Sequence, residues 1–384
     1  MTTPIVAPVD EVPRQPVSEE PGASSNSLAA WLLRIGSALV IPAVLVLFFF
    51  TFDFLKQEDT NKLIQVAVAV AVGVGGIWLL YWGMDRAISV MPEQVGNAVR
   101  PFAFAGPAMV LLGFYLVYPA VNTFILSFQD SDGEEFVGLA NFQRIFTEET
   151  YLISIRNSVI WVILVPIVAV AIGLAFATLS DRIGKRSETV AKSLIFLPMA
   201  ISFVGASVVW RFVYNFRPEG FGEQIGLLNA VKVAFGGNPV DWISVPLWNN
   251  LLLMVILVWL QTGFAMVILS SAIKAVPVDE IEASRIDGAN EWQVFRKIVI
   301  PSIASTLVVV WTTVLITTWK VFDIVFVMTG GRNDTSVVAE RMVTEFFTFD
   351  NNGMGAALAV LLFVAVLPIL IINVKRFQQQ EATR

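Results

Sequence analysis

The chain has 384 residues, of which 56% are hydrophobic and 15% are charged, and its formal net charge is −6. Soluble domains carry about 25% charged residues, so this composition predicts a membrane protein. The chain contains no histidine and no cysteine, which excludes disulfides, thiolate or histidine metal sites and Ser-His-Asp hydrolysis, and its negative charge argues against nucleic-acid partners.

Residues 1–27 are predicted to form a disordered tail. They include five prolines and four acidic residues and show no apolar periodicity, which is the composition of a segment that cannot bury a core. They also lack the basic start and the small-residue cleavage site of a signal peptide.

Eight apolar windows follow. Each has at least 18 residues and no charge: 35–52, 63–84, 101–129, 157–180, 193–210, 242–273, 298–319 and 351–374. Because a spanning helix needs about 20 largely apolar residues, we predict an all-α polytopic membrane protein with about eight transmembrane helices. Seven is the alternative, if the N-terminal pair includes a re-entrant segment. Prolines at positions 42, 107, 119, 166, 198 and 368 predict kinks.

The basic residues predict the orientation of the chain in the membrane. With the N-terminus in the cytoplasm, fifteen Lys and Arg fall in the inside segments and eight in the outside segments. This excess follows the positive-inside rule, so both termini and the loop over 277–301 are predicted to be cytoplasmic.

The loop over 277–301 is polar and charged, although it lies between two apolar windows. Pro277 and the acidic residues after it predict the start of a short helix, and Gly288 predicts its end in a left-handed residue. Asn290, with Gln293 three residues later, predicts a capping box at the start of a second helix.

A run with fixed spacing lies inside this loop: Glu282-Ala283-Ser284, three residues, Gly288, nine residues, and Ile298-x-Ile300-Pro301. It resembles the "EAA" loop of bacterial ABC importer permeases, whose pattern is Glu-Ala-Ala, three residues, Gly, nine residues, Ile-x-Leu-Pro. The chain departs from this pattern at Ser284 and Ile300. The flanking Asp287 and Ala289 are similar to those of the sugar-importing branch. The alternative is an ordinary amphipathic connector on the membrane surface.

Two further stretches carry the resemblance. Residues 138–142 resemble the loop after the first core helix of sugar permeases, and residues 320–331 resemble the maltose and α-glucoside group. The resemblance implies an importer core of six helices over 101–377. Two extra transmembrane helices over 28–100 precede this core, and a cytoplasmic tail over 378–384 follows it.

The resemblance also implies the function and the partners. The chain is expected to be the permease subunit of an ATP-driven importer of an oligosaccharide or α-glucoside in the bacterial inner membrane, and not an enzyme. Its expected partners are a second homologous permease, two ATPase subunits, an extracytoplasmic sugar-binding protein, the sugar and the lipid bilayer. Because the chain has no Gly-rich phosphate-binding loop, we expect no cofactor in it and Mg-ATP on the ATPase subunits.

Two groups of residues are the candidates for function. The resemblance implies coupling to the ATPase, with Glu282 meeting a basic residue there, through Glu282, Ala283, Ser284, Asp287, Gly288, Ala289, Ile298 and Pro301. A sugar path needs polar groups beside aromatic faces, and the candidates in the fifth to seventh helices are Trp210, Tyr214, Trp259, Gln261, Thr317, Thr318, Trp319, Lys320 and Asp323. Lys320 and Asp323 are expected to pair across one helix turn, either on the path or as a snorkelling pair near the outer interface.

Other functions remain as alternatives. An importer for another solute is the closest one. A secondary transporter is less favoured, because no predicted span has an Asp or Glu at its centre. A membrane-embedded enzyme is disfavoured by the lack of histidine, cysteine and a buried carboxylate pair.

Overall fold

The computed structural model describes residues 28–57, 60–89, 91–181, 183–218 and 220–382, so the predicted tail at 1–27 lies outside the described residues. The described part is almost entirely helical, and its one β-contact is an isolated bridge between Gln129 and Phe136. The predicted all-α class is therefore confirmed. The chain divides into two compact units, Met1–Tyr118 and Pro119–Arg384.

The first unit contains α1 (Leu28–Leu55), α2 (Lys62–Ile88), α3 (Glu93–Leu112) and the π-helical turn η1 (Gly113–Val117). Helix α1 packs along α2, and α2 packs on α3, where the rings of Tyr81 and Phe104 stack with their centroids 5.8 Å apart. Helix α3 continues through η1 into α4 (Tyr118–Leu126), so this apolar helix begins at Glu93, earlier than the predicted position 101.

The second unit holds the other helices. In chain order they are α5 (Ala140–Thr147), α6 (Glu149–Ser180), α7 (Lys185–Phe196), η2 (Leu197–Ala200), α8 (Phe203–Val213), α9 (Leu227–Ala234), α10 (Trp248–Lys274), α11 (Val278–Ile286), α12 (Glu291–Val294), η3 (Phe295–Val299), α13 (Ile300–Ser302), α14 (Ala304–Trp319), α15 (Asp323–Met328), α16 (Val338–Phe347) and α17 (Asn352–Ala382).

The core of the second unit lies between α6, α10 and α14. Trp161 of α6, Leu257 of α10 and Val314 of α14 are fully buried in it. Gly173 allows α6 and α10 to approach closely, because a Cβ at this position would lie 2.6 Å from the Cβ of Ala265. Small residues at such crossings are typical of packed helices in membranes, where close backbone contact drives association.

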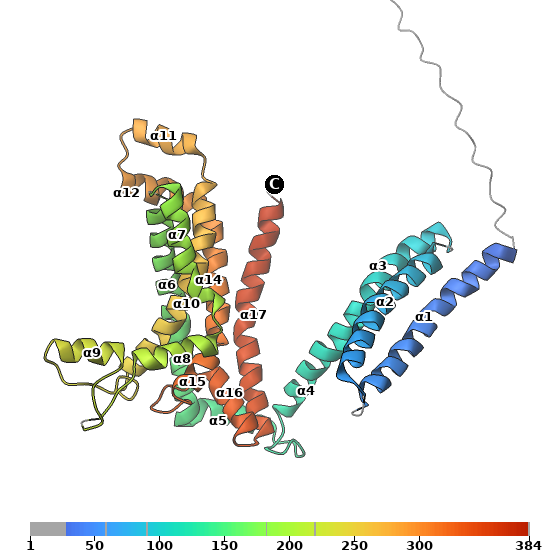
Figure 1. The fold of residues 1–384 in the computed structure, drawn as a ribbon, viewed down its shortest axis with the longest axis horizontal. Helices are drawn as coiled ribbons and strands as arrows, with labels where there is room; N and C mark the ends of the chain where they lie inside the picture. The colour runs from blue at the N-terminus through green and yellow to red at the C-terminus, as the bar shows by residue number, and fades with distance from the viewer. Residues whose placement is uncertain (1–27, 58–59, 90, 182, 219, 383–384) are drawn as a thin grey trace, which may run out of the picture. The chain divides into compact units, whose positions relative to one another are not determined.

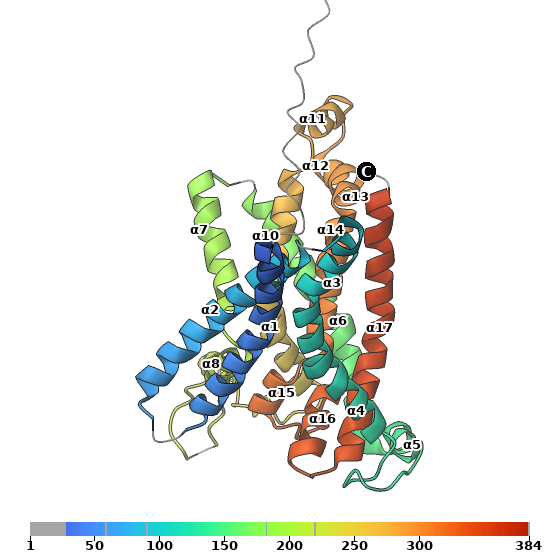
Figure 2. The same ribbon diagram turned by 90° about the vertical axis from the view of Figure 1, so that its right-hand side faces the viewer.

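The two ends of this unit carry different elements. Helices α11 and α12 lie at one end, and α5, α15 and α16 lie at the opposite end, in both views (Figures 1 and 2). We call the first the loop end, because it carries the loop over 277–301, and the second the far end.

The sharpest bend separates α7 from α8. Pro198 lies in the short 3₁₀ turn η2, and Ile201 after it is extended. Ser202 then begins α8 by accepting a hydrogen bond from the amide of Gly205 at 3.1 Å. This capped break divides the apolar window 193–210 into two helices that meet at 103°, and α8 crosses the bundle (Figure 1).

The described residues do not confirm the predicted number of spans. Two helix pairs could each form one span only with a break: Lys185–Ala200 with Phe203–Val213, and Glu291–Ser302 with Ala304–Trp319, which are bent by 103° and 72°. Five helices are long and apolar enough to cross a membrane on their own: Lys62–Ile88, Glu93–Leu126, Glu149–Ser180, Trp248–Lys274 and Asn352–Lys375. Helix α1 has 28 residues and adds an apolar stretch over Leu39–Leu55. The described residues thus support five to seven spans, and the predicted count of eight is not confirmed.

Candidate functional site

The first helix of the 277–301 loop ends in a Schellman turn. Pro277 precedes α11, and Asp287 caps its C-terminus. Gly288 follows with φ +87°, a conformation that side chains with a Cβ disfavour. The amide of Gly288 donates to the Arg285 carbonyl at 3.1 Å, and the amide of Ala289 donates to the Ser284 carbonyl at 3.0 Å. The predicted helix stop at Gly288 is confirmed.

The second helix begins with the predicted capping box. The Gln293 amide donates to Asn290 Oδ1 at 2.9 Å, and the Asn290 amide donates to Gln293 Oε1 at 2.8 Å. Arg285 of α11 binds Glu291 of α12 with two hydrogen bonds of 3.0 and 3.3 Å. These local bonds fix two short helices against each other, so the loop has a defined shape without any partner.

The predicted coupling residues divide by exposure. Glu282, Ala283, Asp287, Gly288 and Pro301 are exposed, and Ser284, Ala289 and Ile298 are half-buried. The Ser284 hydroxyl donates to the Ile281 carbonyl at 2.7 Å, and Ile298 packs against the core. Among the described residues, no ion pair or hydrogen bond engages the Glu282 carboxylate.

Trp292 and Phe295 lie at the base of this loop. Their ring centroids are 5.7 Å apart, and Trp292 remains 66% exposed. Together they line an apolar groove beside the end of α6 that includes Leu174 and Leu179. Trp292 therefore does not pack into the core of this chain, whereas Val299 is buried.

Three of the predicted path residues lie together. The ring of Trp210 is 5.2 Å from that of Tyr214 and 5.7 Å from that of Trp259, between centroids. Tyr214 is buried, and its hydroxyl donates to the Leu252 carbonyl at 2.9 Å. Helices α8 and α10 thus form an aromatic cluster, made of Trp210, Tyr214 and Trp259.

The other predicted path residues are already engaged or lie elsewhere. The hydroxyls of Thr317 and Thr318 donate to carbonyls four residues earlier in α14, at 3.0 and 2.8 Å. The indole of Trp319 donates to the Leu362 carbonyl at 2.9 Å. Gln261 is buried on α10, the helix that carries Trp259.

The predicted pairing of Lys320 with Asp323 is wrong. Helix α14 ends at Trp319 and α15 begins at Asp323, so the two residues do not share a helix turn. Lys320 is exposed, and it forms no ion pair with another residue in the part of the chain that the structure describes. The break between them lets α15 turn aside and pack against α8.

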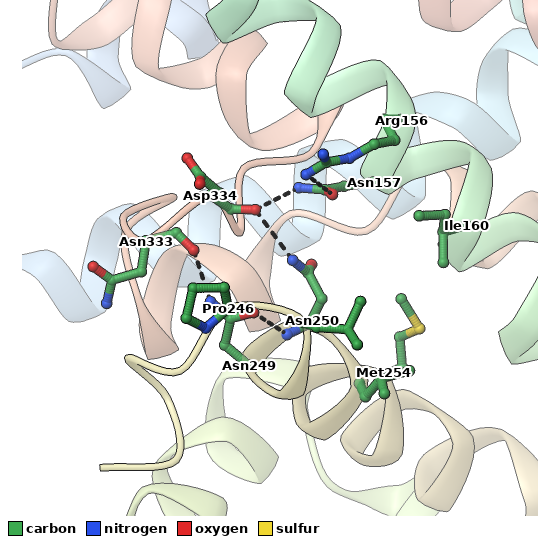
Figure 3. Close-up of a pocket in the computed structure, with 11 residues that line it drawn as sticks. Arg156, Asn157, Ile160, Pro246, Asn249, Asn250, Met254, Asn333 and Asp334 are labelled. Carbon is green, nitrogen blue, oxygen red and sulfur yellow. Dashed lines mark hydrogen bonds between the residues drawn. The ribbon is translucent and has the colours of Figure 1, made fainter.

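A pocket with a mixed apolar and polar lining, which the sequence did not reveal, opens at the far end; Figure 3 shows it in close-up. It has a volume of about 370 Å³ and lies between α6, the start of α10 and the turn that follows α15. Its lining combines amides, one cation and one carboxylate with apolar side chains: Arg156, Asn157, Ile160, Pro246, Leu247, Asn249, Asn250, Leu251, Met254, Asn333 and Asp334. Leu247 has φ +71°, a strained conformation of the kind that gathers at functional sites.

Three asparagine side chains hold the turn at this pocket. Asn157 donates to the carbonyl of Asp334 at 2.7 Å and, with its second hydrogen, to the Ser336 carbonyl at 2.8 Å. Asn249 donates to the Asn333 carbonyl at 2.7 Å, and Asn250 donates to the Asp334 carbonyl at 3.1 Å. Figure 3 shows these amides converging on the turn. We call this set of bonds the asparagine latch.

The comparison with known proteins decides the family. Residues 155–382 match the family described as "Binding-protein-dependent transport system inner membrane component". The chain belongs to this family. It is therefore a multi-span permease of an inner-membrane ABC importer, and the resemblance predicted from the loop over 277–301 is confirmed. The family is a transport component and not an enzyme.

Several relatives of this permease carry descriptive names. It is 51% identical over 281 residues to an osmoprotective compounds uptake permease of Synechocystis sp.. The aligned residues make up 73% of this chain and 100% of the relative. It is 48% identical over 294 residues to an alpha-glucoside transport system permease of Rhizobium meliloti. The aligned residues make up 76% of this chain and 87% of the relative. Over 275 residues it is 26% identical to a trehalose/maltose transport system permease of Thermococcus litoralis, with 70% and 90% covered.

The fold also has a counterpart among solved structures. A chain of a bacterial ABC transporter involved in the import of the acidic polysaccharide alginate superposes with a TM-score of 0.65 at 18% identity. The match covers 75% of this permease and 99% of that chain. This likeness confirms the fold of an ABC importer permease.

Proposed function

We propose that this permease carries α-glucosides across the inner membrane in an importer driven by ATP. The relatives in Rhizobium meliloti and Thermococcus litoralis are named for the transport of alpha-glucosides and of trehalose and maltose. In this proposal the core over 101–377 forms part of the path, and residues 28–100 add two membrane helices.

The loop over 277–301 is proposed to couple the permease to a cytoplasmic ATPase. The observation that carries this proposal is the prefolded, exposed pair of short helices at the loop end, with the Glu282 carboxylate free of partners among the described residues. A free carboxylate on a rigid support suits a charge-assisted bond to a basic residue of a partner. In this role Ala283 and Ser284 are small enough for close approach, Asp287, Gly288 and Ala289 form the turn, and Ile298 and Pro301 anchor the loop to α14.

The orientation and the partners follow from the same proposal. The loop end faces the cytoplasm, as do both termini, which agrees with the excess of Lys and Arg in the inside segments. The far end faces an extracytoplasmic sugar-binding protein. A second homologous permease completes the path, and two ATPase subunits bind Mg-ATP, because this chain has no Gly-rich phosphate-binding loop.

The proposed path passes the aromatic cluster of α8 and α10. Aromatic faces beside polar groups suit a sugar, whose rings have apolar faces and hydroxyl rims. Gln261 would supply a polar group on the same helix as Trp259, and the end of α14 contributes Thr317, Thr318 and Trp319, while Lys320 and Asp323 belong to the next turn. ATP-driven closure of the ATPase would move the coupling loop and switch the permease between two states, open to one side or the other.

One observation favours a second substrate class. The relative in Synechocystis sp. is 51% identical and is named for osmoprotective compounds. The second candidate is therefore an importer of small neutral osmolytes, with the same coupling and the same path.

The experiment is transport by the complete complex. The permease is copurified with its second permease and ATPase and reconstituted into liposomes with the sugar-binding protein. Uptake of labelled maltose, trehalose, sucrose and glycine betaine is measured with and without ATP. We expect ATP-dependent uptake of at least one α-glucoside and none of glycine betaine. Uptake of glycine betaine alone would favour the osmolyte candidate, and ATP-independent uptake would refute the proposed coupling.

A further inference from the structure

Four charged side chains from three helices meet at the loop end of the second unit. The carboxylate of Glu188, on α7, binds the ammonium groups of both Lys192 and Lys274. Lys274 also lies 3.5 Å from the carboxylate of Asp181, which caps α6. We call these residues, Asp181, Glu188, Lys192 and Lys274, the ionic cluster. Among the described residues it pairs two cations with two anions.

The ionic cluster has a buried half and an exposed half. The side chain of Glu188 is 11% exposed, whereas that of Lys274 is 47% exposed. Lys192 also binds the hydroxyl of Ser270, which is buried on α10 one turn before Lys274. The cluster therefore connects the C-terminal turn of α10 to the end of α6 and to the first turns of α7.

Lys274 occupies a special place in the chain. It is the last residue of α10, and only three residues separate it from the first residue of α11, Val278, in the loop over 277–301. Any displacement of the loop thus acts first on the segment that Lys274 anchors. The cluster binds this segment to α7, and the chain runs from α7 through η2 and the break after it to α8 and the aromatic cluster. A second contact supports the same connection, because a Cβ on Gly263 of α10 would lie 2.6 Å from the Ile195 carbonyl of α7.

A contribution to the stability of the fold does not by itself explain why the ionic cluster is present. Buried charge pairs often contribute little or nothing to stability when compared with apolar residues of similar size. The half-exposed bonds of Lys274 are of the kind that adds little to stability. A role in holding two helices in a fixed relation during a movement explains why these charges converge here.

We propose that Lys274 is a positioning residue, which couples movement of the 277–301 loop to α6 and α7 through Asp181 and Glu188. This inference rests on the proposed function, since it assumes that the loop moves with an ATPase. It predicts that loss of the Lys274 charge separates ATP hydrolysis from sugar movement without unfolding the permease.

The test compares Lys274→Gln with Lys274→Arg and wild type in the reconstituted complex. Sugar transported and ATP hydrolysed are measured in the same liposomes, with maltose, trehalose and sucrose as probes. Glu148→Gln is the matched control, because Glu148 forms a half-exposed pair with Arg144 at the far end, at 2.6 Å. Glu188→Gln and the double variant with Lys274→Gln show whether the two residues act as one unit.

We expect Lys274→Gln to assemble at the wild-type level and to hydrolyse ATP in response to the loaded binding protein. Its sugar transported per ATP should fall by about fivefold or more, the lower end of the usual range for coupling between sites. Lys274→Arg and Glu148→Gln should keep the wild-type ratio, and the double variant should be no worse than the poorer single variant.

Three outcomes would overturn the inference. They are an unchanged ratio in Lys274→Gln, an equal loss in Glu148→Gln, and a parallel fall of transport and hydrolysis, which would indicate a structural role only. A wild-type complex that shows no ATP-dependent sugar uptake would instead refute the proposed function, so the two failures are distinguishable.

Discussion

Gly288 offers the sharpest test of how the loop over 277–301 holds its shape. Its φ is +87°, and a Cβ added there would meet no atom within 4 Å. Replacement by alanine therefore costs only backbone strain, about 1–2 kcal/mol for a side chain in the left-handed region. Restriction of the unfolded chain offsets up to about 1 kcal/mol of this. The remaining cost of about 1 kcal/mol should favour opening of the turn about fivefold.

Hydrogen exchange of the purified permease measures this opening directly. The reporters are the amides of Gly288 and Ala289, which donate to the Arg285 and Ser284 carbonyls at 3.1 and 3.0 Å. We expect protection to fall about fivefold in Gly288→Ala, less in Gly288→Asn, since Asn tolerates this conformation, and more in Gly288→Val. Equal protection in Gly288→Ala and wild type would refute the strain argument, as would a larger loss in Gly288→Asn than in Gly288→Ala.

Three other predictions concern the loop and the far end. Glu282→Lys should abolish sugar uptake at an unchanged membrane level, because this carboxylate is exposed and supports no fold contact; uptake at the wild-type rate would exclude a docking role. Asn157→Ala should destabilise the purified permease by about 1–3 kcal/mol in thermal or denaturant unfolding, because it removes the side-chain donor to the buried Ser336 carbonyl and one of the two side-chain donors to the Asp334 carbonyl. An unchanged midpoint would contradict the asparagine latch. Because the chain has no cysteine, a single introduced cysteine is the only thiol that can react. A membrane-impermeant thiol reagent should label Glu282→Cys from the cytoplasmic side and Glu223→Cys from the outer side. Labelling of both variants from the same side would disprove the orientation.

The backbone of the loop over 277–301 was predictable because its signals are local. Gly288, Asn290 and Gln293 determine their backbone through bonds that join residues no more than five positions apart. The helical class was predictable for a similar reason, since spans are read from apolar length. A kink at Pro198 was predicted, but its angle of 103° was not, because a proline permits a break in a helix without fixing its angle. Ser202, which caps the new helix, is one of many serines in apolar windows.

Contacts between segments that are distant along the chain could not be predicted from the sequence. Lys320 and Asp323 have the spacing of a helical pair, but the chain breaks between them to pack α15 on α8. Lys274 and Glu188 are 86 residues apart, and Asn157 and Asp334 are 177 apart. The charges that end apolar windows, such as Asp181 and Lys274, were visible as boundaries. Whether these two side chains contact each other depends on how the helices pack, and a single sequence does not determine that packing.

The asparagine latch has a consequence for how the far end can evolve. The side-chain amides of Asn157, Asn249 and Asn250 donate hydrogen bonds to main-chain carbonyls. The backbone at the rim of the pocket is therefore held in the same way whatever side chains the rim carries. Asn333 and Asp334 have φ of +56° and +57°, which favours asparagine, aspartate and glycine at these two positions. Exchange between aspartate and asparagine at these positions would therefore change the charge of the rim, while the scaffold beneath stays the same.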